Sequence, residues 1–190
     1  MNEIEIKFIL PDRQRILDLL RSKSCVFTSS KKQVDTVYAK NIGDLNTFLS
    51  SDVFLRIRIV DESQAVLTLK KPISREELSK REHETKIDDP HEMEEILMLM
   101  GFQKAVVTEK TRITTNYNGA AICIDSVKDL GDFIELEKQD NRPPDVVRRE
   151  LLDCADALGL KPVDEVKEGY DILMLRKLQS KKSPSPFSAN

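Results

Sequence analysis

Charged residues alternate with apolar residues in several short segments of this chain, and the first is Glu3-Ile4-Glu5-Ile6-Lys7. Residues i and i+2 share a face in a β-strand, so the three charged side chains lie opposite the two isoleucines. The recurring polar positions are almost all Glu, Asp, Lys or Arg, whereas an ordinary solvated sheet face also carries Thr, Ser and Gln. This choice of residues favours a ligand-binding face over an ordinary wet one.

The charged positions on these faces divide into two sets. The basic set is Lys7, Arg56, Arg58, Lys70, Lys86, Lys110 and Arg112, and the acidic set is Glu3, Glu5, Glu82, Glu84, Asp125, Glu135 and Glu137. Lysine and arginine can neutralise phosphate oxygens, but carboxylates repel them unless Mg²⁺ or Mn²⁺ bridges the two. Both signs together therefore predict a site for metal and polyphosphate. The alternative is a half-solvated sheet whose charges pair with one another and need no ligand.

Helices with apolar stripes are predicted between the strands. The first begins at Pro11-Asp12, and the second begins at Asp89-Pro90 and ends at Gly101. The third spans Pro143 to Leu158, and the fourth spans Glu168 to Leu178. Strands are predicted from Glu3 to Leu10, within Cys25 to Ile87, and at Ala105 to Tyr117, Ala120 to Val127 and Asp132 to Lys138, with an Asn118-Gly119 hairpin and a loop or single helical turn at Gly43 to Ser51. The stripes suit the apolar strand faces, so we expect the helices to cover them and the charged faces to be enclosed.

The composition is that of a soluble globular protein. The 190 residues include 33% charged and 39% hydrophobic residues, with 30 Lys and Arg against 33 Asp and Glu. The sequence has no basic stripe of the kind that predicts nucleic-acid binding, and it has no apolar run of membrane-span length. Cys25, Cys123 and Cys154 are far apart without metal-binding spacing, so we interpret them as small buried residues of a cytoplasmic protein. Residues 1–178 are predicted to form one domain, and the polar, proline-broken segment 179–190 a disordered tail.

The ordered set of charged strands resembles the CYTH family, also called triphosphate tunnel metalloenzymes. Glu3-Ile4-Glu5-Ile6-Lys7 matches the family's N-terminal ExExK motif. The later matches follow in the family's order: Leu55-Arg56-Ile57-Arg58, Leu67-Thr68-Leu69-Lys70, Arg81-Glu82-His83-Glu84, Lys110-Thr111-Arg112, Asp125, Leu130 to Glu137, and Gly169-Tyr170. Lys71 stands where the family often has a glycine after the strand lysine, which allows an additional phosphate contact or an altered loop. The Gly43 to Ser51 loop departs from the common pattern, so the resemblance does not define recognition of the non-phosphate group.

The resemblance implies an eight-stranded antiparallel closed β-barrel flanked by helices, with a charged interior. It implies that Lys7, Arg56, Arg58, Lys70, Lys110 and Arg112 bind phosphate, to which the strand pattern adds Lys86. Glu3, Glu5, Glu135 and Glu137, together with Glu82, Glu84 and Asp125, would hold one or two Mg²⁺ or Mn²⁺ ions. Glu3, Glu5, Lys7, Arg58 and Lys110 are the residues expected to carry catalysis.

Two reactions of the family use the same lining. A class IV adenylyl cyclase converts ATP to cyclic AMP and pyrophosphate, and the overall pattern favours this group. A triphosphatase hydrolyses thiamine triphosphate, inorganic tripolyphosphate or a nucleoside triphosphate. A non-catalytic polyphosphate or nucleotide binder is a third hypothesis, and the retained carboxylates favour catalysis over it. The partner would be a triphosphate-bearing small molecule, and the protein a monomer or homodimer.

Overall fold

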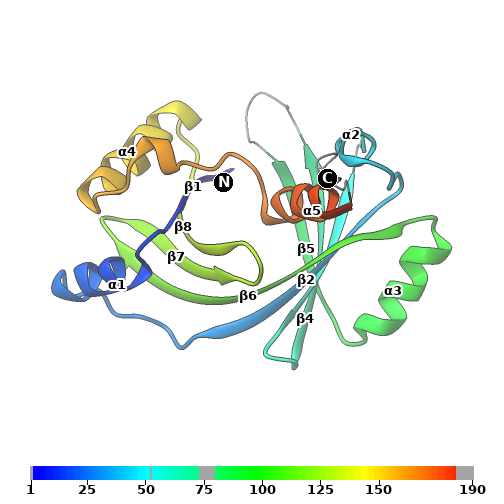
Figure 1. Cartoon of the computed structure of the whole chain (residues 1–190). Helices are drawn as coiled ribbons and strands as arrows, with labels where there is room; N and C mark the ends of the chain where they lie inside the picture. The colour runs from blue at the N-terminus through cyan, green and yellow to red at the C-terminus, as the bar shows by residue number, and fades with distance from the viewer. Residues whose placement is uncertain (1, 52, 73–79, 183–190) are drawn as a thin grey trace, which may run out of the picture. The chain divides into compact units, whose positions relative to one another are not determined.

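The computed structural model describes residues 2–51, 53–72 and 80–182, which form the strands and helices drawn in Figure 1. The strands are β1 (Asn2–Ile9), β2 (Lys31–Ala39), β3 (Phe54–Val60), β4 (Gln64–Pro72), β5 (Lys80–Ile87), β6 (Gln103–Tyr117), β7 (Ala120–Val127) and β8 (Gly131–Asp140). The helices are α1 (Arg13–Ser22), α2 (Leu45–Leu49), α3 (Pro90–Leu99), α4 (Pro144–Ala157) and α5 (Tyr170–Lys182), with a short 3₁₀ helix η1 (Pro162–Asp164).

The strands form one eight-stranded sheet in the order β1-β8-β7-β6-β2-β3-β4-β5. The pairs β1–β8, β8–β7, β7–β6, β3–β4 and β4–β5 are antiparallel. The predicted mainly antiparallel eight-stranded fold with flanking helices is confirmed. The prediction of a closed barrel goes further than the structure. In the part of the chain described, the sheet begins at β1 and ends at β5, and these two strands do not pair.

The chain divides into two compact units, which share strands β2 and β6. The first unit comprises residues 2–33 and 109–167, and the second comprises residues 34–72, 80–108 and 168–182 of the described chain. The two units are described separately below because each has its own apolar core and its own charged residues.

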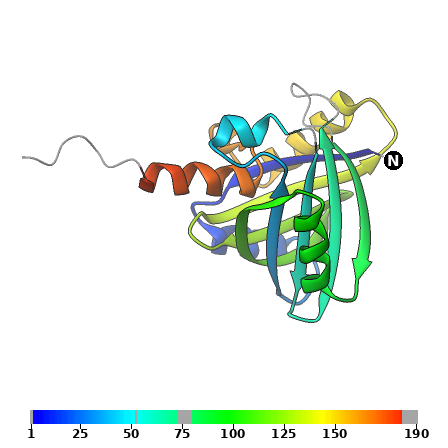
Figure 2. The ribbon, with the colours of Figure 1, turned by 90° about the vertical axis from the view of Figure 1, so that its right-hand side faces the viewer.

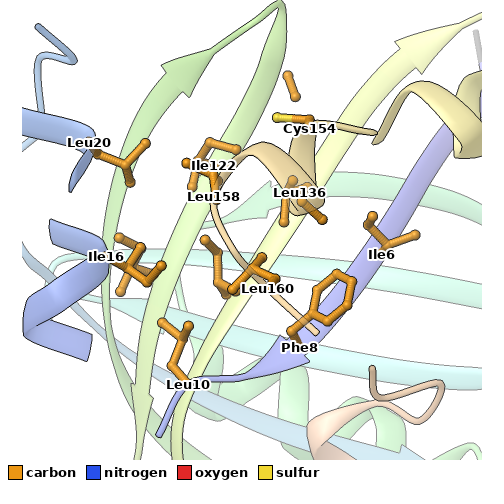
Figure 3. Close-up of a cluster of buried hydrophobic side chains, with 14 of the residues drawn as sticks. Ile6, Phe8, Leu10, Ile16, Leu20, Ile122, Leu136, Cys154, Leu158 and Leu160 are labelled. Atoms are coloured by element: carbon orange, nitrogen blue, oxygen red, sulfur yellow. The ribbon is translucent and has the colours of Figure 1, made fainter. Parts of the chain in front are cut away.

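Helices α1 and α4 cover the apolar strand faces of the first unit. Figure 3 shows Ile6 and Phe8 of β1 beside Ile122 of β7 and Leu136 of β8 in one buried cluster. The same cluster contains residues of α1 and α4: Ile16, Leu17, Leu20, Leu151, Cys154, Ala155 and Leu158. Burial of this apolar area drives the helices onto the strands. The predicted covering of the strands by helices is confirmed in this unit, and the charged positions lie on the opposite face.

Helix α3 lies against strands of the second unit (Figure 2). Leu55 and Ile57 of β3 pack in one buried cluster with Tyr38 of β2, Leu97 of α3 and Phe102. Alternation along β3 then places the arginines at positions 56 and 58 on the other face of the strand.

Local signals set several element boundaries as predicted. The Asp89 carboxylate accepts hydrogen bonds from the backbone N–H groups of His91 and Glu92 at 2.9 Å, so Asp89 is the N-cap of α3. Asn118 and Gly119 have φ of 49° and 74°, as a tight hairpin turn between β6 and β7 requires. The last helix runs to Lys182, past the predicted boundary at residue 178. Most of the predicted disordered tail, from 183 to 190, lies outside the described residues.

Candidate functional site

The charged residues of the first unit form what we call the first cluster. Its members come from four strands: Glu3, Glu5, Lys7, Lys110, Arg112, Asp125, Glu135 and Glu137. Strand register explains why they meet, because Lys7 lies opposite Glu135 and Glu5 opposite Glu137 across β1 and β8. Arg112 likewise lies opposite Asp125 across β6 and β7. Residues directly opposite in neighbouring strands place their side chains on one face.

Arg112 is held by two buried carboxylates. Its Nε and Nη2 donate to the two carboxylate oxygens of Asp125 at 2.7 and 2.5 Å, and its Nη2 also donates to Glu135. Asp125 is 0% exposed, so its charge is neutralised by protein cations and not by water. Burial acts to lower the pKa of Arg112, but the hydrogen bonds to Asp125 and the charge of Glu135 outweigh it and raise the pKa. The guanidinium is therefore a fixed positive charge.

Lys7 is a second fixed cation in the first cluster. Its Nζ lies 3.1 Å from a Glu135 carboxylate oxygen and 3.4 Å from one of Glu5. Burial acts to lower the pKa of Lys7, and the charges of Glu135 and Glu5 overcome it, so the pKa is raised. The backbone of this residue is also held, because Lys7 O accepts from Val166 N at 2.8 Å. Lys110, also buried, donates from Nζ to Asp125 at 3.3 Å.

Glu135 and Glu137 differ in electrostatic environment although only one residue separates them on β8. Burial acts to raise the pKa of Glu135, but the charges of Lys7, Arg112 and Lys110 lower it well below the ordinary value. For Glu137, burial and the nearby Glu3 carboxylate raise the pKa to about 7. Glu135 is therefore already neutralised by protein cations, whereas Glu137 is not.

The electrostatic state of Glu137 bears on whether the predicted metal fits. The first cluster contains five carboxylates and three cations, and the charges of Glu3 and Glu5 both raise the pKa of Glu137. A divalent cation would relieve this repulsion, and carboxylate oxygens are the donors that Mg²⁺ and Mn²⁺ prefer. Among the described residues, no three His, Cys, Asp or Glu side chains are already arranged to hold a metal ion. The donor chemistry fits, and the metal assignment stays a prediction.

The charged residues of the second unit form a second cluster: Asp35, Arg56, Arg58, Lys70, Glu82, Glu84 and Lys86, together with Thr68. Arg58 makes a bidentate ion pair with Asp35, with Nε–Oδ1 and Nη2–Oδ2 distances of 2.7 Å. Lys70 Nζ lies 2.8 Å from a Glu82 oxygen. Lys86 is exposed on β5. Arg56, Arg58 and Lys70 thus each have a carboxylate counterion on another strand of the sheet.

The sequence-based assignment missed two residues of the second cluster. Asp35 is 6% exposed and holds Arg58, yet β2 was recognised only by its Val, Thr and Tyr residues. An acidic residue flanked by the β-branched Val34 and Thr36 was the available signal. Thr68 is 0% exposed and contacts both Arg56 and Glu84, and a lone threonine in a strand gives no comparable signal.

The predicted acidic set has two kinds of surroundings. The carboxylates of five residues lie in ion pairs with an arginine or lysine, and these are Glu5, Glu82, Glu84, Asp125 and Glu135. Glu137 lies near other carboxylates. Cys123 and Cys154 are buried, as predicted, and Cys25 is partly exposed. Strand register, which the sequence pattern did not reveal, separates the carboxylates that pair with protein cations from Glu137, whose pKa is raised.

A family model for the CYTH domain matches residues 1–170. The chain belongs to the CYTH domain family. A relative from Methanocaldococcus jannaschii, with the provisional name adenylate cyclase, is 29% identical over 172 residues, which is 90% of this chain and 97% of the relative. No helix among the described residues of this CYTH protein has the length and apolar character needed to cross a membrane.

Solved structures share the fold of this CYTH protein. One protein of Pyrococcus horikoshii has a TM-score of 0.77 and 27% identity, with 92% of this chain and 99% of that chain covered. A Hippeastrum protein, provisionally named an adenylyl cyclase and described as having a dominant triphosphatase activity, has a TM-score of 0.64 and 20% identity. That likeness covers 99% of this chain and 100% of the other, and at this identity it shows the fold alone.

Proposed function

We propose that this CYTH protein is a metal-dependent enzyme that acts on a triphosphate and converts ATP to cyclic AMP and pyrophosphate. The observation that carries the triphosphate assignment is the first cluster, where buried cations lie beside carboxylates that repel one another. The cyclase assignment is supported by the Methanocaldococcus jannaschii relative, whose name gives that activity and which this chain matches over nearly its whole length.

Lys7, Lys110 and Arg112 are proposed to neutralise phosphate oxygens. Each is held by a carboxylate, so its charge is in place before the substrate arrives and needs little reorganisation. Asp125 and Glu135 act in this proposal as the groups that hold these cations. For the second unit taken by itself, the residues proposed to bind phosphate are Arg56, Arg58, Lys70 and Lys86.

Glu3, Glu5 and Glu137 are proposed to hold Mg²⁺ or Mn²⁺. The bound metal would supply further charge neutralisation at the phosphate oxygens. The protein residues then fix the substrate for in-line attack, which for the cyclase is attack of the ribose 3′-hydroxyl on the α-phosphorus.

Hydrolysis of a triphosphate is the second candidate reaction. Both clusters offer cations suited to phosphate, and hydrolysis needs only water as the second reactant. A non-catalytic binder could keep these cations and dispense with the carboxylates. Here Glu3, Glu5 and Glu137 are retained, which favours catalysis. The cytoplasmic location and the monomeric or dimeric state stay predictions from the sequence.

The deciding experiment incubates the purified protein with Mg²⁺ or Mn²⁺ and, separately, ATP, inorganic tripolyphosphate or thiamine triphosphate. Cyclic AMP and pyrophosphate from ATP would support the cyclase. Orthophosphate release without cyclic AMP would support the triphosphatase instead. Tight binding without turnover would identify a binder, and neither binding nor turnover would refute the triphosphate assignment.

Two variants test the residue roles in the same assay. Glu5→Gln is expected to lose metal-dependent activity and keep its fold, because it removes one anionic oxygen donor. Arg58→Ala is expected to weaken triphosphate binding, and unchanged affinity would exclude Arg58 from phosphate recognition. Lys128→Ala is the matched control, since Lys128 is an exposed lysine paired with Glu109.

A further inference from the structure

One side chain of each of three neighbouring strands in the second unit forms a continuous row. Arg56 of β3 lies opposite Thr68 of β4, and Thr68 lies opposite Glu84 of β5. Arg56 Nη2 donates to Thr68 Oγ1 at 2.9 Å and to Glu84 Oε1 at 3.2 Å. Thr68 Oγ1 in turn donates to Glu84 Oε1 at 2.8 Å. The threonine hydroxyl is thus both an acceptor and a donor within the row.

The hydroxyl of Thr68 is completely buried, which indicates a role beyond packing. Thr68 is 0% exposed on a strand where valine would fill almost the same volume without a polar atom. A buried hydroxyl is costly unless it is hydrogen-bonded, and this one is bonded to both charged neighbours. Packing alone therefore does not explain a threonine here, whereas the need to orient Arg56 does.

The Nε donor of the Arg56 guanidinium differs from Nη2 in its hydrogen bonding. While Nη2 is fixed by Thr68 and Glu84, the Nε atom is buried and has no hydrogen-bond partner among the described residues. A buried N–H donor without an acceptor costs free energy, and an anion's oxygen would remove that cost. Arg56 thus has one nitrogen, Nη2, held by protein and a second, Nε, whose hydrogen bond is not made among the described residues.

We propose that Thr68 is a positioning residue that, with Glu84, fixes Arg56 so that its Nε–H is presented to a phosphate oxygen of the substrate. The inference rests on the proposed function, because it takes Arg56 as a phosphate contact. It assigns Glu84 to holding the arginine and not to holding metal. Thr68 acts through Arg56 and does not touch the substrate.

The test compares affinities for imidotriphosphate, a tripolyphosphate with nitrogen in the bridges that resists hydrolysis, measured by calorimetry with Mg²⁺. Thr68→Val is expected to weaken binding about tenfold, since one hydrogen bond to a charged group is lost. Thr68→Ser keeps the hydroxyl and should restore wild-type affinity. Thr85→Val is the matched control, because Thr85 is an exposed neighbour of Glu84 on β5. Unfolding temperatures of all variants separate a change in orientation from a loss of fold.

An NMR measurement on the wild type keeps the proposal testable even if Thr68→Val does not fold. The Arg56 Nε–Hε resonance should shift when imidotriphosphate binds, and a resonance that does not move would overturn the proposal. Normal affinity in a folded Thr68→Val variant, with weakened affinity in Arg56→Ala, would overturn it while leaving the proposed function intact. If Arg56→Ala and Arg58→Ala also bind as tightly as wild type, the assignment of phosphate to this cluster fails as well.

Discussion

Replacing Glu137 by glutamine removes a carboxylate whose pKa is raised by burial and by the charges of Glu3 and Glu5. A carboxyl group with a raised pKa in the folded state binds its proton more tightly there than in the unfolded chain. Its contribution to stability is therefore present below the unfolded pKa and is lost as pH rises through the folded pKa. For Glu137 the loss falls between pH 4.5 and about 7. A glutamine side chain at this position has no carboxyl proton to lose, so the variant should not show this part of the pH dependence.

The size of the Glu137 effect follows from the two pKa values. A change from 4.5 to about 7 corresponds to roughly 3 kcal/mol at 25 °C if the group were fully shielded from water. Because the side chain is only partly buried, solvent screening reduces the expected effect to about 1–2 kcal/mol. The metal-free wild type should lose this much more stability than Glu137→Gln as pH rises across that interval.

Urea unfolding followed by circular dichroism, in EDTA at about pH 5 and about pH 8, measures the effect as a difference of free energies of unfolding. Glu95→Gln, an exposed position on α3, is the control for loss of one negative charge. Parallel pH profiles of wild type and Glu137→Gln would refute the reasoning. Mg²⁺ at the higher pH should stabilise the wild type more than the variant, because the metal binds the folded carboxylates.

Three further outcomes are expected. Arg112→Ala leaves the buried carboxylates of Asp125 and Glu135 without their main cation, so urea or thermal unfolding should show a free energy of unfolding lower by about 4 kcal/mol. A decrease below about 1 kcal/mol would contradict the ion-pair geometry. A double-mutant cycle of Asp35→Ala and Arg58→Ala should give a coupling free energy of about 2 kcal/mol by urea unfolding, because the pair is bidentate and mostly buried, and additive effects would argue against it. Burial raises the pKa of the Cys123 thiol to about 12. A thiol-specific reagent near neutral pH should therefore modify the partly exposed Cys25 first, which mass spectrometry can show. Faster reaction at Cys123 would contradict its burial.

Much of the fold followed from periodicity and from turn chemistry. Alternation in Glu3 to Lys7 assigned β1 and both of its faces correctly, and Asn118-Gly119 located the β6–β7 hairpin. These signals are local, since they depend on residues two apart in a strand or adjacent in a turn. The sequence of the Gly43 to Ser51 segment does not distinguish a loop from a single helical turn. In the structure this segment contains the short helix α2. Pairing between β1 and β5 depends on residues far apart in the sequence. Local sequence patterns therefore do not determine whether the sheet closes.

The sequence by itself determined which residues of this protein are charged, which strand face each occupies and, through the order of its motifs, its membership of the CYTH family. It did not determine which charges meet. Tertiary structure placed Lys7 opposite Glu135, and Arg112 opposite Asp125, and placed Glu137 near three other carboxylates. Register between β1 and β8, which are far apart in sequence, decides the first pair, whereas the β6–β7 hairpin sets the second. The cations beside Glu135 lower its pKa, and the carboxylates beside Glu137 help to raise its pKa. The chemistry of each acidic residue was therefore set by its neighbours across the sheet.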